Sequence, residues 1–232
     1  MTYLTLLSKR LQAVASMVDP KTRLADIGSD HAYLPVDLIS KDIIDFAIAG
    51  EVAPGPMSRS QADITKFGYD EKIKVRLGDG LAVIKAEDDI QTVVIAGMGG
   101  ILISDILSRA TKEQLSNVKT LILQPNIGEP LVRQWLVKNS FEIIDEDIVE
   151  EDNHVYEIIK ASFTTNKVEL SESEYLMGPI LIHKHSAVFI DKWTHKLNSY
   201  QKAVANMKNA KSIDEAKITQ MNDYIKYIEE IL

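Results

Sequence analysis

The stretch LADIGSDHAYLP, residues 24–35, holds the first side chains whose types and spacing could do chemistry. An apolar run ends at Asp26, a turn follows at Gly28, and a helical pattern begins soon after, which is typical of a nucleotide-binding turn. The phosphate-binding fingerprint of dinucleotide folds needs glycine at 28, 30 and 33, whereas this chain has Gly28, Asp30 and Tyr33. A bulky carboxylate at the second position obstructs and repels a pyrophosphate. The turn therefore disfavours a nicotinamide or flavin cofactor.

An acidic turn suits a ligand that carries positive charge and no phosphate. S-adenosylmethionine is such a molecule, with an ammonium group at its amino-acid end, a sulfonium and an adenosine. Asp26 and the turn after it could face the ammonium group, because a carboxylate attracts that cation. The alternative is a plain strand–helix turn in which an Asp caps the helix.

Two further acidic residues follow later apolar runs. Glu51 lies 23 residues after Gly28, and a carboxylate there could accept hydrogen bonds from both ribose hydroxyls. Asp79 stands between Gly78 and Gly80, so its carboxylate could accept from the adenine amino group while the glycines admit the ring. Each residue alone is weak evidence, because NAD-binding folds also place an acid after the second strand and Gly-Asp-Gly is often a simple turn.

The turns after the next two apolar runs could receive the methyl acceptor. Residues 96–100, AGMGG, leave the backbone bare where ligands of open α/β sheets bind, so a flat group could approach there. Residues 124–126, QPN, carry amides that could read a base edge or could cap the next turn. Tyr33 could stack on a nucleobase and Asn126 could hold its edge, although a tyrosine at such a place is more often part of the core.

These turns need a scaffold that brings them together, and the apolar pattern predicts one. Continuous apolar runs, typical of parallel strands buried on both faces, alternate with helical patterns. Only residues 150–154 separate the last two runs, so we expect an antiparallel hairpin there. The pattern predicts an α/β fold with a doubly wound, mostly parallel seven-stranded sheet, the Rossmann-like methyltransferase variant. The expected strands are 24–27, 46–52, 73–77, 92–96, 120–123, 141–149 and 155–163, and the expected helices lie near 34–40, 56–67, 101–109 and 130–139.

Helical patterns also stand at both ends of the chain. Leu4, Leu7, Leu11, Val14 and Val18 predict an N-terminal amphipathic helix.

After residue 162, apolar residues step by three and four along 190–207 and along 218–232, which predicts two antiparallel helices with a coiled-coil-like seam. Ser212 and Glu215 fit a capping box before the second helix. We predict a domain over residues 1–162 and a helical tail over residues 163–232.

Charge is distributed unevenly along the chain. The net charge of −8 argues against a general nucleic-acid coat, since phosphates would be repelled. Residues 183–211, however, contain six Lys and only Asp191 as an acid. These lysines are candidates for phosphate contacts, although Lys is also the usual residue of a solvent-exposed helix face.

The composition sets further limits. With no cysteine, the chain has no disulfide, thiolate metal site or thiol nucleophile, which fits a reducing compartment. No apolar run is long enough to span a bilayer, and the N-terminus turns polar too early for a secretory signal. We therefore expect a cytoplasmic protein with no membrane partner and no metal. An open flank of the tail could dimerise, so we expect a monomer or a weak homodimer.

The motifs DIGSDHAYLP, GEV, GDGL, IAGMGG and QPN, followed by a helical-hairpin tail, together resemble the bacterial tRNA adenine-N1 methyltransferases that act on adenine 22. The resemblance covers essentially the whole chain and implies a class I methyltransferase fold, S-adenosylmethionine as cofactor and tRNA as partner. His31, which could otherwise only cap a helix, is assigned to the cofactor by the resemblance. The residues that would line the cofactor are Asp26, Gly28, Ser29, His31, Glu51, Val52, Asp79, Gly80, Ala96 and Gly97.

Candidate tRNA contacts are basic residues in two parts of the chain. Arg10 and Arg59 could hold a substrate phosphate or the cofactor carboxylate, although a lone Arg more often lies on a solvated face. Lys184, Lys192 and Lys196 could contact the tRNA backbone, and such contacts would make binding depend on salt.

The expected chemistry needs little acid–base help. N1 of adenine has a free lone pair, so no base must deprotonate it before it attacks a methyl group, and catalysis rests on placement and on tolerance of the positive charge. We predict methyl transfer from S-adenosylmethionine to N1 of a tRNA adenine, at position 22 by resemblance, with Tyr33 and Asn126 as catalytic candidates on an extracted base. Two alternatives stay open: a methyltransferase with a protein or small-molecule acceptor, and a non-catalytic tRNA-binding module of the same fold.

Overall fold

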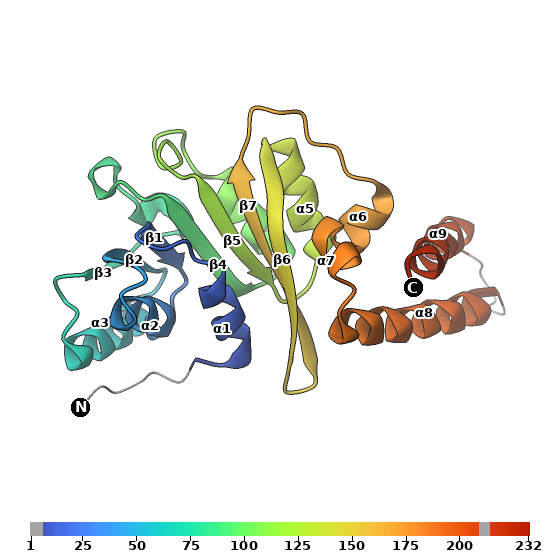
Figure 1. Ribbon diagram of the computed structural model, residues 1–232, viewed down its shortest axis with the longest axis horizontal. Helices are drawn as coiled ribbons and strands as arrows, with labels where there is room; N and C mark the ends of the chain where they lie inside the picture. The colour runs from blue at the N-terminus through green and yellow to red at the C-terminus, as the bar shows by residue number, and fades with distance from the viewer. Residues whose placement is uncertain (1–6, 209–213) are drawn as a thin grey trace. The chain divides into compact units, whose positions relative to one another are not determined.

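The computed structural model describes residues 7–208 and 214–232 (Figure 1). The chain forms two compact units, Met1–Val168 and Glu169–Leu232, and each is described by itself. Within the described residues, no helix is both long enough and apolar enough to cross a bilayer.

The first unit is built on one seven-stranded sheet with the strand order β3-β2-β1-β4-β5-β7-β6. Strands β1 to β5 pair in parallel, whereas β7 runs antiparallel to β5 and β6 antiparallel to β7. The predicted mostly parallel sheet ending in a hairpin is therefore confirmed. The strands are β1 (Arg23–Ile27), β2 (Phe46–Glu51), β3 (Ile73–Leu77), β4 (Thr92–Met98), β5 (Thr120–Pro125), β6 (Phe141–Glu151) and β7 (His154–Phe163).

Helices alternate with the parallel strands, as the sequence predicts. They are α1 (Lys9–Ser16), α2 (Tyr33–Ser40), α3 (Pro54–Phe67), α4 (Gly100–Ser108) and α5 (Glu129–Lys138), with the short 3₁₀ turns η1 (Gly80–Val83) and η2 (Ala86–Asp88). The α1 helix is shorter than the predicted amphipathic helix, because Ser8 caps it through a 3.3 Å hydrogen bond from the Leu11 N–H. Leu4 of that pattern lies outside the described residues.

The hairpin turn between β6 and β7 follows from two residues. Asp152 and Asn153 both adopt left-handed conformations, with φ of 50° and 60°. A two-residue loop with positive φ at both positions matches the right-handed twist of the strands, and Asp and Asn tolerate that conformation better than most residues. Glu151 and His154 consequently face each other as the last pair of the ladder.

A charged cluster lies inside this unit, where the apolar pattern gives no sign of it. Arg133 of α5, Glu146 of β6 and Glu157 of β7 are all fully buried. The Arg133 Nε donates to Glu146 at 2.8 Å, and an Nη donates to Glu157 at 2.5 Å. Burial opposes the charge on Arg133, but the two carboxylates outweigh it and raise the pKa of the guanidinium. The cluster ties α5 to both strands of the hairpin.

The second unit consists of α6 (Glu172–Met177), α7 (Pro179–Lys184), α8 (Ala187–Lys208) and α9 (Glu215–Ile231). The two long helices pack on each other, with the Tyr200 and Tyr224 rings 5.8 Å apart. The capping residue at the start of α9 is Asp214, which accepts from the Lys217 N–H, while the predicted Ser212 lies outside the described residues.

The predicted seam of the tail is buried at only some of its positions. Trp193, Val204, Ile218 and Ile228 are buried, but Ile190 is 37% exposed. Phe189, which precedes Ile190, is fully buried and takes the inward position. The heptad pattern therefore fails at the start of α8.

Candidate functional site

The candidate site lies at the carboxyl edge of the sheet, the edge where β1, β2, β4 and β5 end. The strand order places β1 beside β4, so the chain leaves the two strands in opposite directions at this point. Ligands of open α/β sheets bind at such a switch point, outside the carboxyl ends of the strands. The segments singled out in the sequence all lie at or just after the carboxyl ends of the parallel strands, at this edge.

The turn after β1 has an unusual backbone. Gly28 has a φ of 74°, a left-handed conformation that favours glycine, and a Cβ there would lie 2.3 Å from the Met98 Cε, so the end of that side chain would have to move. Asp30, His31 and Ala32 then follow with φ of 37°, 67° and 55°. Three successive left-handed non-glycine residues are strained, and such strain concentrates at functional sites. The N-cap of α2 is Ala32 with no side-chain cap, so neither Asp30 nor His31 caps the helix.

Asp26, the next-to-last residue of β1, is a buried carboxylate. It is 4% exposed, and its Oδ2 accepts a 2.5 Å hydrogen bond from the Ser29 hydroxyl. Burial raises the pKa of Asp26 to about 7, Ser29 opposes that rise, and the charge of Glu51 adds to it. A carboxylate that is costly to ionise without a partner favours a cationic ligand, because the ligand's charge replaces the lost hydration.

Glu51 and Asp79 lie at the ends of the neighbouring strands but in different surroundings. Glu51 is 5% exposed and accepts from the buried Ser60 hydroxyl of α3 at 3.0 Å. Asp79 is exposed, and its two oxygens each lie 3.2 Å from a guanidinium nitrogen of Arg109. A carboxylate held in this way is oriented and still open to solvent.

The remaining cofactor candidates line the same turns. Val52 follows Glu51 and is 73% exposed. Gly80 has a φ of 56°, and a Cβ there would lie 2.9 Å from Ile106. Ala96 and Gly97 lie near the end of β4, just before its last residue Met98, and Gly97 has a φ of 77°. The positive φ angles of Gly80 and Gly97 favour glycine, which places no side chain on these two turns.

His31 and Tyr33 form a small aromatic stack beside the β1 turn. The rings are 5.2 Å apart and nearly parallel, at 10°. His31 Nδ1 lies 2.8 Å from the Asp63 carboxylate of α3, which fixes the imidazole. Tyr33 is 40% exposed rather than part of the core, so its ring is available for stacking.

The turns after β4 and β5 are joined by side chains. Gln124 is fully buried and accepts from Arg10 of α1 at 2.6 Å and from the Gly97 N–H at 2.9 Å. Asn126 is exposed and donates to the Gly97 carbonyl at 2.8 Å. The Arg10 guanidinium also lies 5.6 Å from the centroid of the Tyr156 ring. Arg10, Gly97 and Asn126, chosen separately from the sequence, are therefore neighbours.

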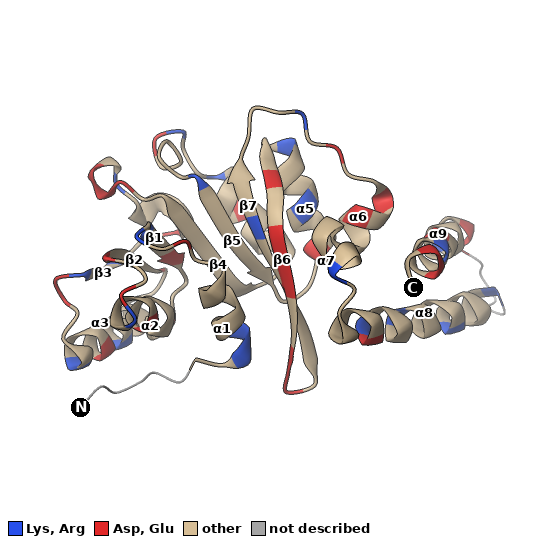
Figure 2. Cartoon of the chain, viewed as in Figure 1, with Lys and Arg blue, Asp and Glu red and all other residues tan. Residues whose placement is uncertain are grey.

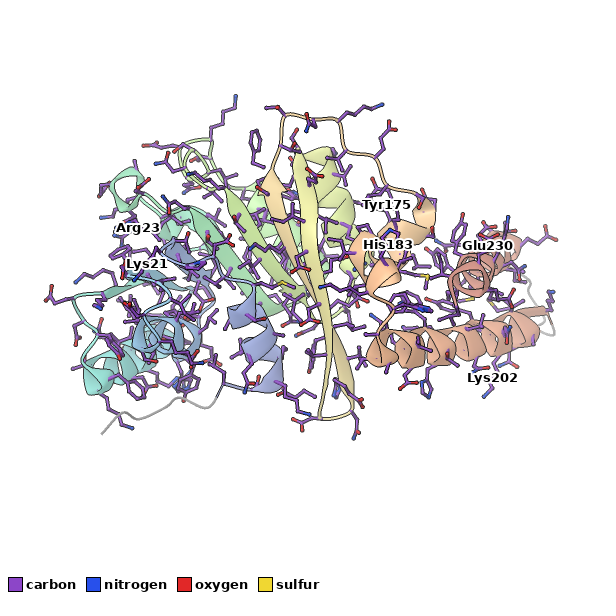
Figure 3. All side chains as sticks on the ribbon, viewed as in Figure 1. Lys21, Arg23, Tyr175, His183, Lys202 and Glu230 are labelled. Atoms are coloured by element: carbon purple, nitrogen blue, oxygen red, sulfur yellow. The ribbon has the colours of Figure 1, made fainter. Side chains whose placement is uncertain are left out.

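The other basic candidates lie elsewhere. Arg59 is exposed on α3 of the first unit. Lys184 ends α7 and Lys192 and Lys196 lie on α8, where Figure 2 shows lysines spread along the helix with one acidic position near its start. Lys202 of the same helix points away from α9 (Figure 3). The first unit and the tail thus carry separate sets of candidate tRNA contacts.

Four site residues escaped the sequence reasoning: Ser60, Asp63, Met98 and Arg109. Ser60 and Asp63 stand three residues apart on one face of α3, and this polar pair is the only signal the sequence offers for them.

The donor set fits S-adenosylmethionine. Buried carboxylates at Asp26 and Glu51 match an ammonium group and ribose hydroxyls. Among the described residues, no group of three or more His, Asp or Glu side chains is arranged to hold a metal ion. A separate cavity of about 480 Å³, bordered by Gln91 and Phe163, lies at the opposite edge of the sheet.

Comparison with known proteins agrees with this geometry. Residues 24–230 match the family model of TrmK, tRNA (adenine(22)-N(1))-methyltransferase. The tRNA (adenine(22)-N(1))-methyltransferase of Bacillus subtilis is 39% identical over 97% of both chains.

Solved structures of similar proteins carry the cofactor or its product. Streptococcus pneumoniae Sp1610, described as a putative tRNA (m1A22) methyltransferase in complex with S-adenosyl-L-methionine, superposes with a TM-score of 0.88 at 39% identity, covering 98% of this chain and 100% of that one. Mycoplasma capricolum TrmK with S-adenosyl-homocysteine gives a TM-score of 0.84 at 26% identity, covering 97% of each chain. Because the family model covers residues 24–230 and the Bacillus subtilis relative matches along nearly the whole chain, this chain belongs to the tRNA (adenine(22)-N(1))-methyltransferase family.

Proposed function

We propose that this protein transfers a methyl group from S-adenosylmethionine to N1 of adenine 22 in tRNA. The observation that carries the proposal is the carboxyl edge of the sheet in a chain of this family. Buried acids for a cationic ligand lie there at the ends of β1 and β2, and the exposed amide of Asn126 follows β5.

Different residues of the carboxyl edge would contact different parts of the cofactor. Asp26 would accept from its ammonium group, Glu51 from its ribose hydroxyls and Asp79 from its adenine amino group. Gly28, Gly80 and Gly97 would let the ligand lie against the backbone. When bound, S-adenosylmethionine supplies a methyl group on a positively charged sulfur, which a lone pair can displace.

The chain's part in the reaction is placement and electrostatics. N1 of adenine is unprotonated at neutral pH, so no side chain has to remove a proton before attack. Tyr33 would stack on the extracted base, and Asn126 would hold its edge. The carboxylates Asp26 and Glu51 favour binding of a cationic cofactor, and the positive charge moves from the sulfur onto the base as the bond forms.

Contacts with tRNA phosphates would come from Arg59 and from Lys184, Lys192 and Lys196 of the tail. The support for them is exposure and charge, because Arg59 and Lys196 lie on exposed helix faces. A phosphate contact by the Arg10 N–H groups that do not face Gln124 is also a prediction. We further propose a cytoplasmic protein that acts as a monomer or a weak homodimer.

The test is a transfer assay with a defined product. Purified protein is incubated with unmodified tRNA and methyl-labelled S-adenosylmethionine, and the digested nucleosides are identified. Labelled 1-methyladenosine, absent when adenine 22 is replaced by guanine, is the expected result. Cofactor binding without transfer to any tRNA would refute the proposal and favour a protein or small-molecule acceptor.

A further inference from the structure

Gln124 has all its side-chain hydrogen-bonding capacity engaged. Its Oε1 accepts from an Arg10 guanidinium nitrogen at 2.6 Å and from the Gly97 N–H at 2.9 Å. Its Nε2 donates to the Pro125 carbonyl at 2.9 Å and to Asn126 Oδ1 at 3.2 Å. The amide is fully buried, so water does not compete for these bonds.

The orientation of both amides is fixed by their partners. A guanidinium and a backbone N–H can only donate, so the atom of Gln124 that faces them must be the oxygen. The nitrogen of Gln124 then faces Asn126, whose near atom must be its oxygen. From the other side, the Gly97 carbonyl accepts at 2.8 Å and requires the Asn126 nitrogen. Turning over either amide would place like groups against each other.

Asn126 is left with one open position on each of its polar atoms. An amide oxygen has two lone pairs, and Gln124 uses one; an amide nitrogen has two hydrogens, and the Gly97 carbonyl uses one. No other group among the described residues bonds to these two atoms. Since Asn126 is exposed at the carboxyl edge, its oxygen keeps one acceptor position and its nitrogen one donor position, and the bonds to Gln124 and Gly97 set which atom is which.

We propose that Asn126 recognises the Hoogsteen edge of the target adenine, with Oδ1 accepting from the N6 amino group and Nδ2 donating to N7. This inference rests on the proposed function and names the specificity-determining residue for it. An asparagine amide pairs with adenine through N6 and N7 in this bidentate way.

The choice of edge follows from the reaction. Pairing of the amide with N6 and N1 would direct the Nδ2 hydrogen at the lone pair of N1, the pair that must form the new bond to carbon. Pairing with N6 and N7 leaves N1 open. Guanine presents an acceptor, O6, where adenine presents the N6 amino group. Because Gln124 holds the Asn126 oxygen toward that position, guanine meets two facing acceptors.

The test replaces one atom of the substrate. A tRNA joined from two halves carries 7-deazaadenosine at position 22, which has C–H in place of N7 and keeps N1 and N6. Wild-type protein should methylate it with a kcat/KM lower by about tenfold, as expected when one hydrogen bond of a bidentate base pairing is removed. The same replacement at a neighbouring adenosine is the control and should have little effect.

A variant then locates the contact. Asn126→Ala should lower kcat/KM on natural tRNA, and for this variant the natural and 7-deaza tRNAs should react equally. The comparison is a ratio of two substrates in one protein preparation, so partial misfolding cancels. Competition binding of the two tRNAs without cofactor gives a second readout, in which wild type should prefer the natural tRNA and Asn126→Ala should show no preference.

The outcomes separate the inference from the proposed function. No 1-methyladenosine from natural tRNA would refute both. Formation of 1-methyladenosine with equal rates for the natural and 7-deaza tRNAs would refute the Hoogsteen contact alone. An N7 penalty that persists in Asn126→Ala would also overturn it, because some other group would then contact N7.

Discussion

In the protein without cofactor, the buried charge of Asp26 should lower the unfolding free energy at neutral pH, and replacing Asp26 should restore it. Asp26→Asn keeps the shape of the side chain and an oxygen to accept from Ser29, which donates to Asp26 at 2.5 Å in the structure. It removes the charge that burial disfavours at this 4% exposed position. The variant should therefore be more stable than wild type at pH 8 while binding S-adenosylmethionine less well.

The magnitude follows from the pKa. Burial raises the pKa of Asp26 from its ordinary value of 3.8 to about 7. Between those values the folded state holds a proton that the unfolded state has released, so the stability of the fold falls as pH rises and levels off above pH 7. Two pH units separate pH 5 from pH 7, and at about 1.4 kcal/mol each the loss from pH 5 to pH 8 is about 3 kcal/mol.

The assay is urea denaturation of both proteins at pH 5 and at pH 8. From pH 5 to pH 8, the unfolding free energy of wild type should fall by about 3 kcal/mol more than that of Asp26→Asn. Other titrating groups contribute equally to both proteins and cancel in this comparison. Ligand should reverse the order, because in the proposed contact the ammonium group of S-adenosylmethionine pairs with ionised Asp26. Added at pH 8, it should stabilise wild type more than the variant.

Asp88 is the matched control. It is also a buried carboxylate, but Arg76 pairs with it through both oxygens. Burial opposes the charge of Asp88, and the bonds from Arg76 and the Lys85 N–H overcome it and lower its pKa. Asp88→Asn should destabilise the protein at both pH values by about 3 kcal/mol, with little change between them. Equal behaviour of the two variants, or a loss of stability in Asp26→Asn that grows toward pH 8, would refute the reasoning.

Three further outcomes are expected. Gly100→Ala places a Cβ 2.3 Å from a backbone oxygen of the loop after β5 and should cost about 2 kcal/mol by urea denaturation, whereas Gly99→Ala, with open space around its Cβ, should stay within about 0.5 kcal/mol. Arg133→Met leaves two buried glutamates without their cation and should cost roughly 3–5 kcal/mol, and an unchanged midpoint would show that the cluster is not what holds α5 to the hairpin. Replacing Lys192 and Lys196 of the tail by Gln should weaken tRNA binding at low salt and leave cofactor affinity unchanged, and the slope of log affinity against log salt should fall by about 0.7–0.9 for each phosphate that is no longer neutralised.

The strands could be predicted because a parallel sheet leaves a strong trace in the sequence. Thr92–Met98, for example, reads as an apolar run followed by glycine. Helix starts were less accurate: α3 begins at Pro54, two residues ahead of the expectation, because proline fits the first turn of a helix. The short helices α6 and α7 escaped, since six residues are too few to show a period. The capping box at Ser171 was the available signal for the first of them.

The turns of the site could be predicted because they follow strands, but their side-chain partners could not. Arg10 and Gln124 stand 114 residues apart and Asp79 and Arg109 stand 30 apart, and a single sequence contains nothing that pairs them. The burial of Glu146 could not be predicted from the sequence either. On an edge strand it reads as a solvent-facing residue, and only the position of Arg133 on α5 explains its burial.

The pairing of Arg10 with Gln124 also resolves a conflict within the site. A flat acceptor needs bare backbone, and the turn after β4 supplies it with Gly97 at a φ of 77°, but glycine gives up the rigidity that placement of a base requires. Gln124 restores that rigidity, because it bonds to the Gly97 N–H and to Asn126, which bonds back to the Gly97 carbonyl. Arg10 lies on α1, before the first strand, and its hydrogen bond to Gln124 helps to hold this set of hydrogen bonds in place. The helix α1 thereby helps to orient the turns at the ends of β4 and β5. In the proposed contact, the target base would meet an Asn126 amide whose orientation is already set by the protein.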